Sequence, residues 1–195
     1  MGFYQMRKEN KIFNMVVTAV FAAIIAVGAF TSLKVGTIPF TLQSFAVFLA
    51  LGTIGWKKGT LSVIVYLLLG LVGAPVFSGF KSGAGVLFGP TGGFLIGFVF
   101  MGLTVGGVSF LLQKTRLNGL VKKIISFVCG NAVLYAFGCL VFAFVYLKKV
   151  DFESFSAAFS ACVLPFLAPD TVKLVVAAII SCQLEKLKIM KKYGI

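Results

Sequence analysis

Long apolar runs separated by short polar connections make up most of the sequence. Most of the runs approach the roughly 20 residues that a helix needs to cross a bilayer, and two are shorter. They are continuous and do not alternate in steps of two, which favours helices over the strands of a membrane barrel. The pattern predicts an all-α membrane protein, a single domain over residues 1–195, with six transmembrane helices at residues 12–30, 40–54, 60–72, 92–112, 124–147 and 165–184.

Composition and charge favour the same class. Of the 195 residues, 59% are hydrophobic and 12% are charged, so polar residues are too few to cover a soluble globule of this size. With both termini in the cytoplasm, 13 of the 18 Lys and Arg residues fall in cytoplasmic segments, as the positive-inside rule requires. The net charge of +13 is then a topology signal with some attraction to anionic lipid, and it predicts no nucleic-acid partner.

Residue types that hold metals or carry out acid–base catalysis are scarce. The chain has no histidine, four of its five acids lie at loops or ends, and its four cysteines show no Cys-x-x-Cys spacing. We expect the cysteines to be small apolar fillers. The sequence therefore predicts no metal site, no cofactor and no enzymatic activity.

Asp170 and Lys173 are the two charges that lie deep in an apolar run. A charge in hydrocarbon costs at least about 2.5–3.5 kcal/mol, so two together need an explanation. Three residues apart, they share a helix face and can bind each other or one ligand. With Pro169 in the first helical turn, Asp170 is expected in the N-terminal turn, where it complements the helix dipole. The pair predicts a binding site or ion path; the alternative is a structural ion pair or a shallow helix start that reaches water.

Three further polar side chains interrupt apolar runs. Gln43 enters the second run, and Asn131 and Tyr135 lie four residues apart in the fifth, on one helix face. Each offers hydrogen-bonding groups that suit a ligand. Hydrogen bonds between helices explain these residues about as well as a ligand does.

A glycine-rich segment covers residues 78–93, in a predicted outer loop. So many glycines permit a compact backbone that approaches a ligand closely or moves as a lid. Phe77, Phe80 and Phe88 are candidate apolar walls for a ring-shaped ligand. A phosphate-binding loop is excluded, because no Gly-Lys-Ser/Thr sequence is present. A second outer loop, residues 30–40, is long enough to fold over a pocket.

Small residues recur at spacings of three and four in the first apolar run, which makes one flat helix face. Such a face either packs inside the bundle or docks another membrane protein. The candidate docking residues are Ala19, Ala22, Ala23 and Ala26.

Four motifs occur in a familiar order along nearly the whole chain. They are Ile-Pro-Phe-Thr-Leu-Gln (residues 38–43), Tyr-Leu-Leu-Leu-Gly with Pro-Val-Phe (66–70 and 75–77), Gly-Pro-Thr-Gly-Gly-Phe-Leu-Ile-Gly-Phe (89–98), and Pro-Phe-Leu (165–167) followed by Asp170 and Lys173. In these motifs the sequence resembles the BioY family, the biotin-specific substrate-binding subunits of energy-coupling-factor (ECF) vitamin importers. The Gly-Pro-Thr-Gly-Gly block and the late Asp/Lys pair are the most specific.

The resemblance implies a six-helix bundle in the cytoplasmic membrane of a bacterium. It would bind biotin from outside, dock on a membrane coupling protein driven by two cytoplasmic ATPases, and hydrolyse nothing itself. It assigns Asp170 and Lys173 to biotin binding and Ala19 and Ala23 to docking. One departure is Ala168-Pro169, where the family commonly has Pro-Gly. Together the residue patterns and the resemblance predict as substrate-binding residues Thr41, Gln43, Phe77, Phe88, Thr91, Asn131, Tyr135, Asp170 and Lys173.

Biotin's chemistry fits these residues in two orientations. Asp170 can accept a ureido N–H while Lys173 donates to the ureido carbonyl, or Lys173 can pair with the terminal carboxylate. The closeness of the two residues favours the ureido end. Rival functions are a self-sufficient secondary transporter of biotin or another small anionic vitamin coupled through protonation of Asp170, an intramembrane enzyme, and a purely structural membrane protein.

Overall fold

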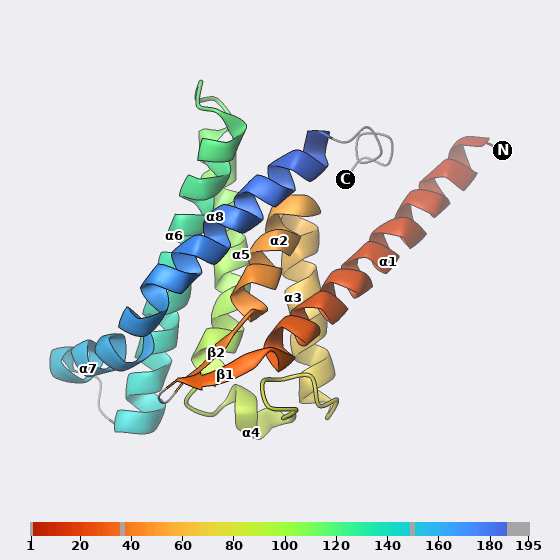
Figure 1. Cartoon of the computed structure of the whole chain (residues 1–195). Helices are drawn as coiled ribbons and strands as arrows, with labels where there is room; N and C mark the ends of the chain where they lie inside the picture. The colour runs from red at the N-terminus through yellow and green to blue at the C-terminus, as the bar shows by residue number, and fades with distance from the viewer. Residues whose placement is uncertain (1, 36–37, 149–150, 187–195) are drawn as a thin grey trace.

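The computed structural model describes residues 2–35, 38–148 and 151–186, and helices form most of this part of the chain (Figure 1). The elements in chain order are α1 (Gly2–Phe30), β1 (Ser32–Val35), β2 (Ile38–Thr41), α2 (Gln43–Thr53), α3 (Trp56–Leu71), α4 (Ala84–Leu87), α5 (Gly92–Leu112), α6 (Gly119–Phe142), the π-helical turn η1 (Ala143–Leu147), α7 (Phe152–Cys162) and α8 (Leu164–Lys186).

Four of the described helices are long and apolar enough to cross a membrane, which makes the chain a multi-pass membrane protein. These segments are Lys11–Phe30, Gly92–Leu112, Gly119–Val145 and Leu164–Lys186. By contrast, α2 has 11 residues and α3 has 16. At about 1.5 Å per residue, α2 is roughly 16 Å long, about half the hydrocarbon thickness. That α2 and α3 complete six crossings, with both termini in the cytoplasm, stays a prediction.

The short helix α2 lies inside the bundle, where it packs against α1, α3 and α8. Nine of its 11 residues are buried. A helix that covers only part of the membrane thickness is tolerated when protein surrounds it, because its terminal peptide groups are kept away from lipid. The first residues of α2 thereby lie between the neighbouring helices.

An antiparallel hairpin of β1 and β2 occupies the segment that the sequence predicts to be an open loop and the start of the second span. Ser32 pairs with Thr41, and the Leu42 N–H donates to the Thr31 carbonyl at 3.2 Å. The predicted helix start at residue 40 is therefore wrong, because the backbone of Phe40 and Thr41 pairs with β1. Figure 1 shows the hairpin lying across one end of the bundle.

The last helix begins earlier than its proline content suggests. α8 starts at Leu164, with Pro165 in its first turn and Pro169 inside the helix. The first turn tolerates Pro165 because its missing N–H would have no helical partner there. Asp170 consequently lies in the second turn, so the prediction that it sits in the N-terminal turn is wrong. Lys173 on the same helix, with hydroxyl donors from neighbouring helices, and not the helix dipole, must compensate its charge.

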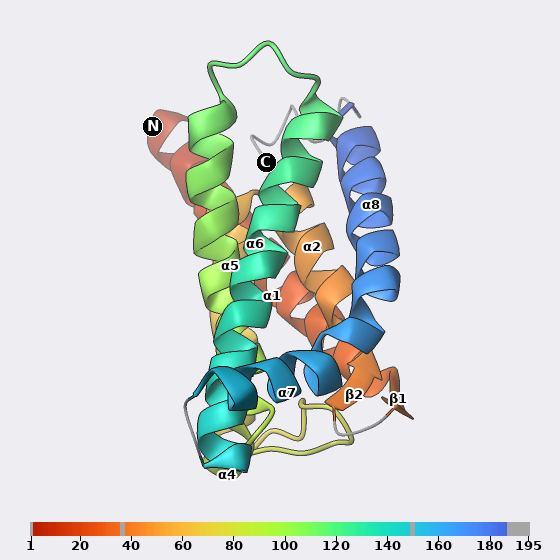
Figure 2. The ribbon, with the colours of Figure 1, turned by 90° about the vertical axis from the view of Figure 1, so that its left-hand side faces the viewer.

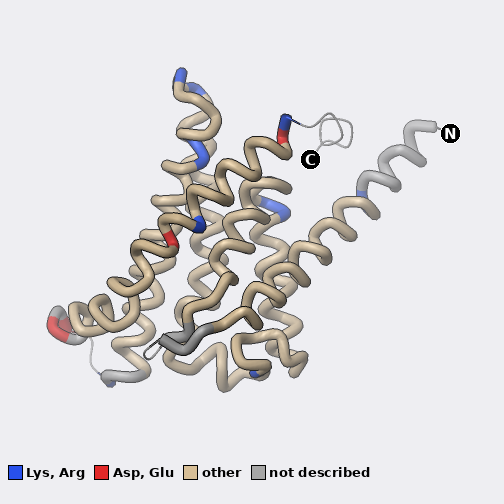
Figure 3. Tube along the Cα trace, in the orientation of Figure 1, with Lys and Arg blue, Asp and Glu red and all other residues tan. Residues whose placement is uncertain are grey.

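The two ends of the bundle differ in structure and charge. The loop between α5 and α6 lies at one end, whereas the hairpin, α4 and α7 lie at the other (Figure 2). Basic residues gather at the α5–α6 end (Figure 3). Here Lys123 pairs with Glu185 at 2.8 Å and donates to the Gly52 carbonyl at 3.0 Å, which joins the ends of α6, α8 and α2.

Candidate binding site

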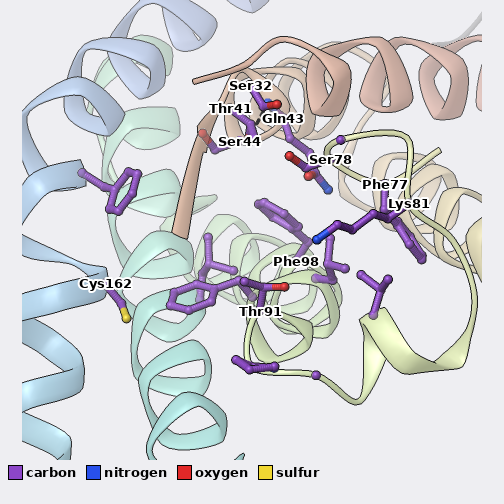
Figure 4. A pocket seen from close by; sticks show the side chains of 18 of the residues that line it. Ser32, Thr41, Gln43, Ser44, Phe77, Ser78, Lys81, Thr91, Phe98 and Cys162 are labelled. Carbon is purple, nitrogen blue, oxygen red and sulfur yellow. Dashed lines mark hydrogen bonds between the residues drawn. The ribbon is translucent and has the colours of Figure 1, made fainter. Parts of the chain in front are cut away.

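A cavity of about 470 Å³ opens at the hairpin end of the bundle. Its volume lies within the roughly 300–1,000 Å³ typical of small-molecule sites. Figure 4 shows side chains converging on it from several elements. The wall is formed by Ser32, Thr41, Gln43 and Ser44 from the hairpin and α2, Phe77, Ser78, Gly79, Lys81, Gly85, Val86, Gly89, Pro90 and Thr91 from the segment between α3 and α5, Phe94, Leu95 and Phe98 from α5, Leu134 and Tyr135 from α6, and Cys162, Phe166, Asp170 and Lys173 from α7 and α8.

The ammonium group of Lys173 is fully engaged within this wall. Its Nζ atom donates to Asp170 Oδ1 at 2.8 Å, to the Thr41 carbonyl at 2.7 Å and to Ser44 Oγ at 3.2 Å. It also lies 3.9 Å from the centroid of the Phe40 ring, within cation–π range. An ammonium has three N–H donors, so all three have acceptors. Lys173 is only 8% exposed, and this network offsets the free-energy cost of burying its charge.

The carboxylate of Asp170 is held by three donors on three elements. Oδ1 accepts from Lys173 Nζ at 2.8 Å and from Ser44 Oγ at 3.0 Å, and Oδ2 accepts from Tyr135 Oη at 2.7 Å. Asp170 is 6% exposed. Lys173 balances its charge, so the pair is neutral overall and presents hydrogen-bonding groups to the cavity. Desolvation offsets most of the attraction within a buried ion pair, so stability alone is a weak reason for it.

Gln43 brings an unsatisfied donor to the same wall. Its side chain is 4% exposed and lies beside the hydroxyl of Tyr66. Nevertheless, Gln43 Nε2 has no hydrogen-bond partner among the described residues. Buried polar groups are normally paired, so a buried amide without a partner next to a cavity indicates a place for a ligand acceptor.

Aromatic rings form the apolar part of the wall. Phe77 is 1% exposed and meets the Tyr66 ring edge-on at a centroid distance of 5.5 Å. Phe166 is stacked on Phe40 at 6.1 Å. Phe98, also buried, lies near the centre of the view in Figure 4. The cavity thus combines a polar, charge-balanced side with rigid apolar surfaces, which suits a compact ring with polar edges.

Seven of the nine predicted substrate-binding residues line this one cavity, although they come from distant parts of the sequence. They are Thr41, Gln43, Phe77, Thr91, Tyr135, Asp170 and Lys173. Their contact with a substrate stays a prediction.

Phe88 and Asn131 are not part of the cavity wall. Phe88 is 73% exposed because it follows the last residue of α4, where Leu87 takes the buried position. It does not line this cavity, and its contact with a substrate stays a prediction. Asn131 lies beside the Tyr135 hydroxyl, but one helical turn away along α6, and its Oδ1 is buried without a partner among the described residues. It does not line this cavity, and its direct contact with a ligand stays a prediction.

Ser44 and Lys81 are polar residues of the wall that were not predicted from the sequence. Ser44 bonds both members of the ion pair, and its signal was a hydroxyl next to Gln43 in an apolar run. Lys81 was counted only as an outer-loop charge, yet it lines the cavity. A lysine within a glycine-rich segment between aromatic residues was the available signal.

The predicted docking face on α1 is divided by the bundle. Ala22 and Ala26 are 2% and 8% exposed and pack against the core, so the prediction that a partner contacts them is wrong. Ala19 and Ala23 are exposed, next to the exposed side chain of Val20. Consecutive helical positions differ by about 100°, so Ala22 faces the bundle whereas Ala23 faces away from it. A narrower strip around Ala19 and Ala23 stays available.

Fold and site together define a multi-pass helical membrane protein with a cavity for a small ligand at one end. The chain belongs to the BioY family, whose model matches residues 6–189.

Curated relatives and a solved structure resemble the chain over most of its length. It is 41% identical to the biotin transporter BioY of Thermotoga maritima, over 90% of this chain and 98% of that protein. It is 37% identical to the biotin transporter BioY of Rhizobium etli, over 86% and 90%. A crystal structure of the S-component for biotin from an ECF-type ABC transporter matches with a TM-score of 0.78 and 27% identity, over 92% of this chain and 94% of that one.

Proposed function

We propose that this chain is the biotin-binding membrane subunit of an ECF-type importer. The observation that carries the proposal is the Asp170–Lys173 pair, buried in the wall of a cavity with aromatic surfaces and with one acceptor position of Asp170 left for a ligand. Membership of the BioY family supports the choice of biotin as the ligand.

The polar side of the cavity matches the ureido group, which has two N–H donors and one carbonyl. A carboxylate has about four acceptor positions, and three of those of Asp170 are filled by Lys173, Ser44 and Tyr135. One position remains for a ureido N–H. Gln43 Nε2 is a free donor for the ureido carbonyl. Phe77 and Phe98 then face the apolar ring and tail of biotin.

The proposed subunit binds its ligand at the outer side of the membrane. The cavity lies at the hairpin end, and basic residues gather at the opposite end, which the positive-inside rule places in the cytoplasm of a bacterium. We propose six crossings, with both termini on the cytoplasmic side.

The energy for uptake is proposed to come from partners, since the subunit itself hydrolyses nothing. A membrane coupling protein, driven by two cytoplasmic ATPases, would contact the strip around Ala19 and Ala23. This surface is exposed, and the small side chains permit close helix packing.

Equilibrium binding of biotin to the detergent-solubilised chain tests the proposal. We expect tight binding that Asp170→Asn and Lys173→Met each weaken about tenfold or more. A well-folded parent that does not bind biotin would overturn the assignment. Biotin uptake that continues after the coupling protein and ATPases are deleted, and stops when the proton gradient is removed, would instead indicate a secondary transporter.

A further inference from the structure

Two cations line the cavity, and their surroundings differ. Lys173 is paired with Asp170 and donates to three acceptors. The ammonium of Lys81 is exposed and makes no ion pair or hydrogen bond with any described residue. Because the Asp170–Lys173 pair is neutral, Lys81 supplies the net charge of the described cavity wall, which is +1. Such a cavity is complementary to a ligand with one negative charge.

A constrained turn directs Lys81 toward the cavity. The Phe77 N–H donates to the Lys81 carbonyl at 3.0 Å, which closes the turn. Within it, Gly79 and Phe80 have φ angles of 72° and 57°. A left-handed backbone is unfavourable for a side chain as bulky as phenylalanine, so surrounding contacts must hold it.

Two phenylalanine rings of the turn make such contacts with the rest of the protein. The Phe80 ring stacks on Phe30, at the end of α1, with a centroid distance of 4.5 Å and an interplanar angle of 21°. The Phe77 ring is 1% exposed and packed against Tyr66. Figure 4 shows the Lys81 side chain extending from this segment into the cavity. A lysine whose backbone is fixed in this way reaches the ligand with less loss of conformational entropy.

We propose that Lys81 binds the carboxylate of the ligand and so selects the free acid over amide-linked or esterified forms. The inference rests on the proposed function, in which Asp170 and Gln43 bind the ureido end and leave the carboxylate to another part of the wall. An amide at this position has lost the negative charge, so Lys81 no longer favours it.

The test compares the affinities of the full chain for biotin and for neutral biotinamide. The variants are Lys81→Met, Lys81→Arg and a control, Lys114→Met, which removes the same charge in the α5–α6 loop at the opposite end. We expect Lys81→Met to weaken biotin binding about tenfold and to leave biotinamide binding within about twofold. Lys81→Arg should keep most of the preference for biotin, and the control should change neither affinity. Higher ionic strength should reduce the preference in the parent, because the lysine is exposed to solvent.

The possible failures are distinguishable. Equal weakening of both ligands in Lys81→Met, or weakening of neither, would overturn the role of Lys81. A parent that binds biotin and biotinamide equally would also overturn it and leave the proposed function intact. A folded parent that binds neither ligand would remove the proposed function itself.

Discussion

The hydroxyl of Tyr135 in α6 donates to Oδ2 of Asp170 in α8 at 2.7 Å, while Lys173 binds Oδ1 of the same carboxylate at 2.8 Å. The carboxylate is thus fixed by side chains from two helices, α6 and α8, that both line the cavity. Its orientation depends on α6 as well as on its own helix. A ligand that binds Asp170 therefore meets an acceptor set in place before binding, which reduces the entropy lost on association.

Removal of that hydroxyl should weaken both binding and folding. Tyr135→Phe leaves Asp170 Oδ2 buried without its donor, at a cost of about 1–3 kcal/mol in the free energy of unfolding. We expect biotin affinity to fall several-fold because the carboxylate is no longer held from α6. Titration calorimetry and thermal unfolding in detergent measure the two effects.

Tyr66→Phe is the matched control. The Tyr66 hydroxyl is buried and has no hydrogen-bond partner among the described residues. Its removal should leave the free energy of unfolding unchanged or slightly higher. Tyr66 does not line the cavity, but its hydroxyl lies beside Gln43, so the two variants are compared by their stability. Equal losses in the two variants would contradict a special role for the Tyr135–Asp170 bond.

Variants of the Asp170–Lys173 ion pair should affect protein stability and biotin affinity differently. Asp170→Asn or Lys173→Met alone leaves one buried charge without its partner, which costs about 3–5 kcal/mol. The double variant removes both charges, so we expect it to recover much of this stability. Biotin binding should stay weak in all three, because Asp170→Asn removes the charged acceptor and Lys173→Met removes the cation that holds this carboxylate in place. A double variant that regains affinity along with stability would indicate a purely structural pair.

Glu185→Gln provides the comparison for an ion pair outside the site. Glu185 pairs with Lys123 at 2.8 Å, but its side chain is 50% exposed. Such pairs contribute roughly 0–1 kcal/mol, so stability and biotin affinity should both change little. The same measurements apply.

The long helices were predictable from the sequence because hydrophobicity and length determine them locally. The predicted span 92–112 coincides with α5 (Gly92–Leu112), and 165–184 lies within α8 (Leu164–Lys186). The hairpin was not predicted, because its pairing depends on the turn and on burial against the bundle. Pro169 misled the prediction of where Asp170 lies along α8, since the helix continues through the proline.

Polarity in apolar runs identified the centre of the site but not its edges. Asp170, Lys173, Gln43 and Tyr135 stood out because each needs a partner at membrane depth. In the glycine-rich segment no periodicity shows which side chains face inward, so Phe77 and Phe88 were indistinguishable. Helix periodicity predicts that Asn131 and Tyr135 share one face of α6. It does not show how far along that face the cavity extends.

A bulky residue on the exposed strip of α1 should separate binding from transport. Ala23→Trp faces outward, so we expect folding and biotin affinity to be preserved, while assembly with the coupling protein and biotin uptake are lost. Co-purification of coexpressed subunits and uptake in cells measure this. Leu103→Trp, at a 50% exposed position of α5, is the control and should leave assembly intact. Normal uptake by Ala23→Trp would contradict docking at this strip.

Close backbone packing beside the cavity should make one glycine of α5 irreplaceable. A Cβ atom at Gly92 would collide with the backbone carbonyls of Leu87 and Val86, which cannot rotate away as a side chain does. We expect Gly92→Ala to lower the free energy of unfolding by about 1–3 kcal/mol and to weaken biotin binding, since Thr91 and Val86 belong to the cavity wall.

Gly107→Ala is the matched control in the same helix, because a Cβ there meets nothing within 4 Å. Alanine is the better helix former, so this variant should gain up to about 1 kcal/mol and bind biotin normally. Thermal unfolding and biotin titration of the two variants measure these effects. A stable Gly92→Ala protein that binds biotin fully would show that the α4–α5 junction is looser than its backbone contacts indicate.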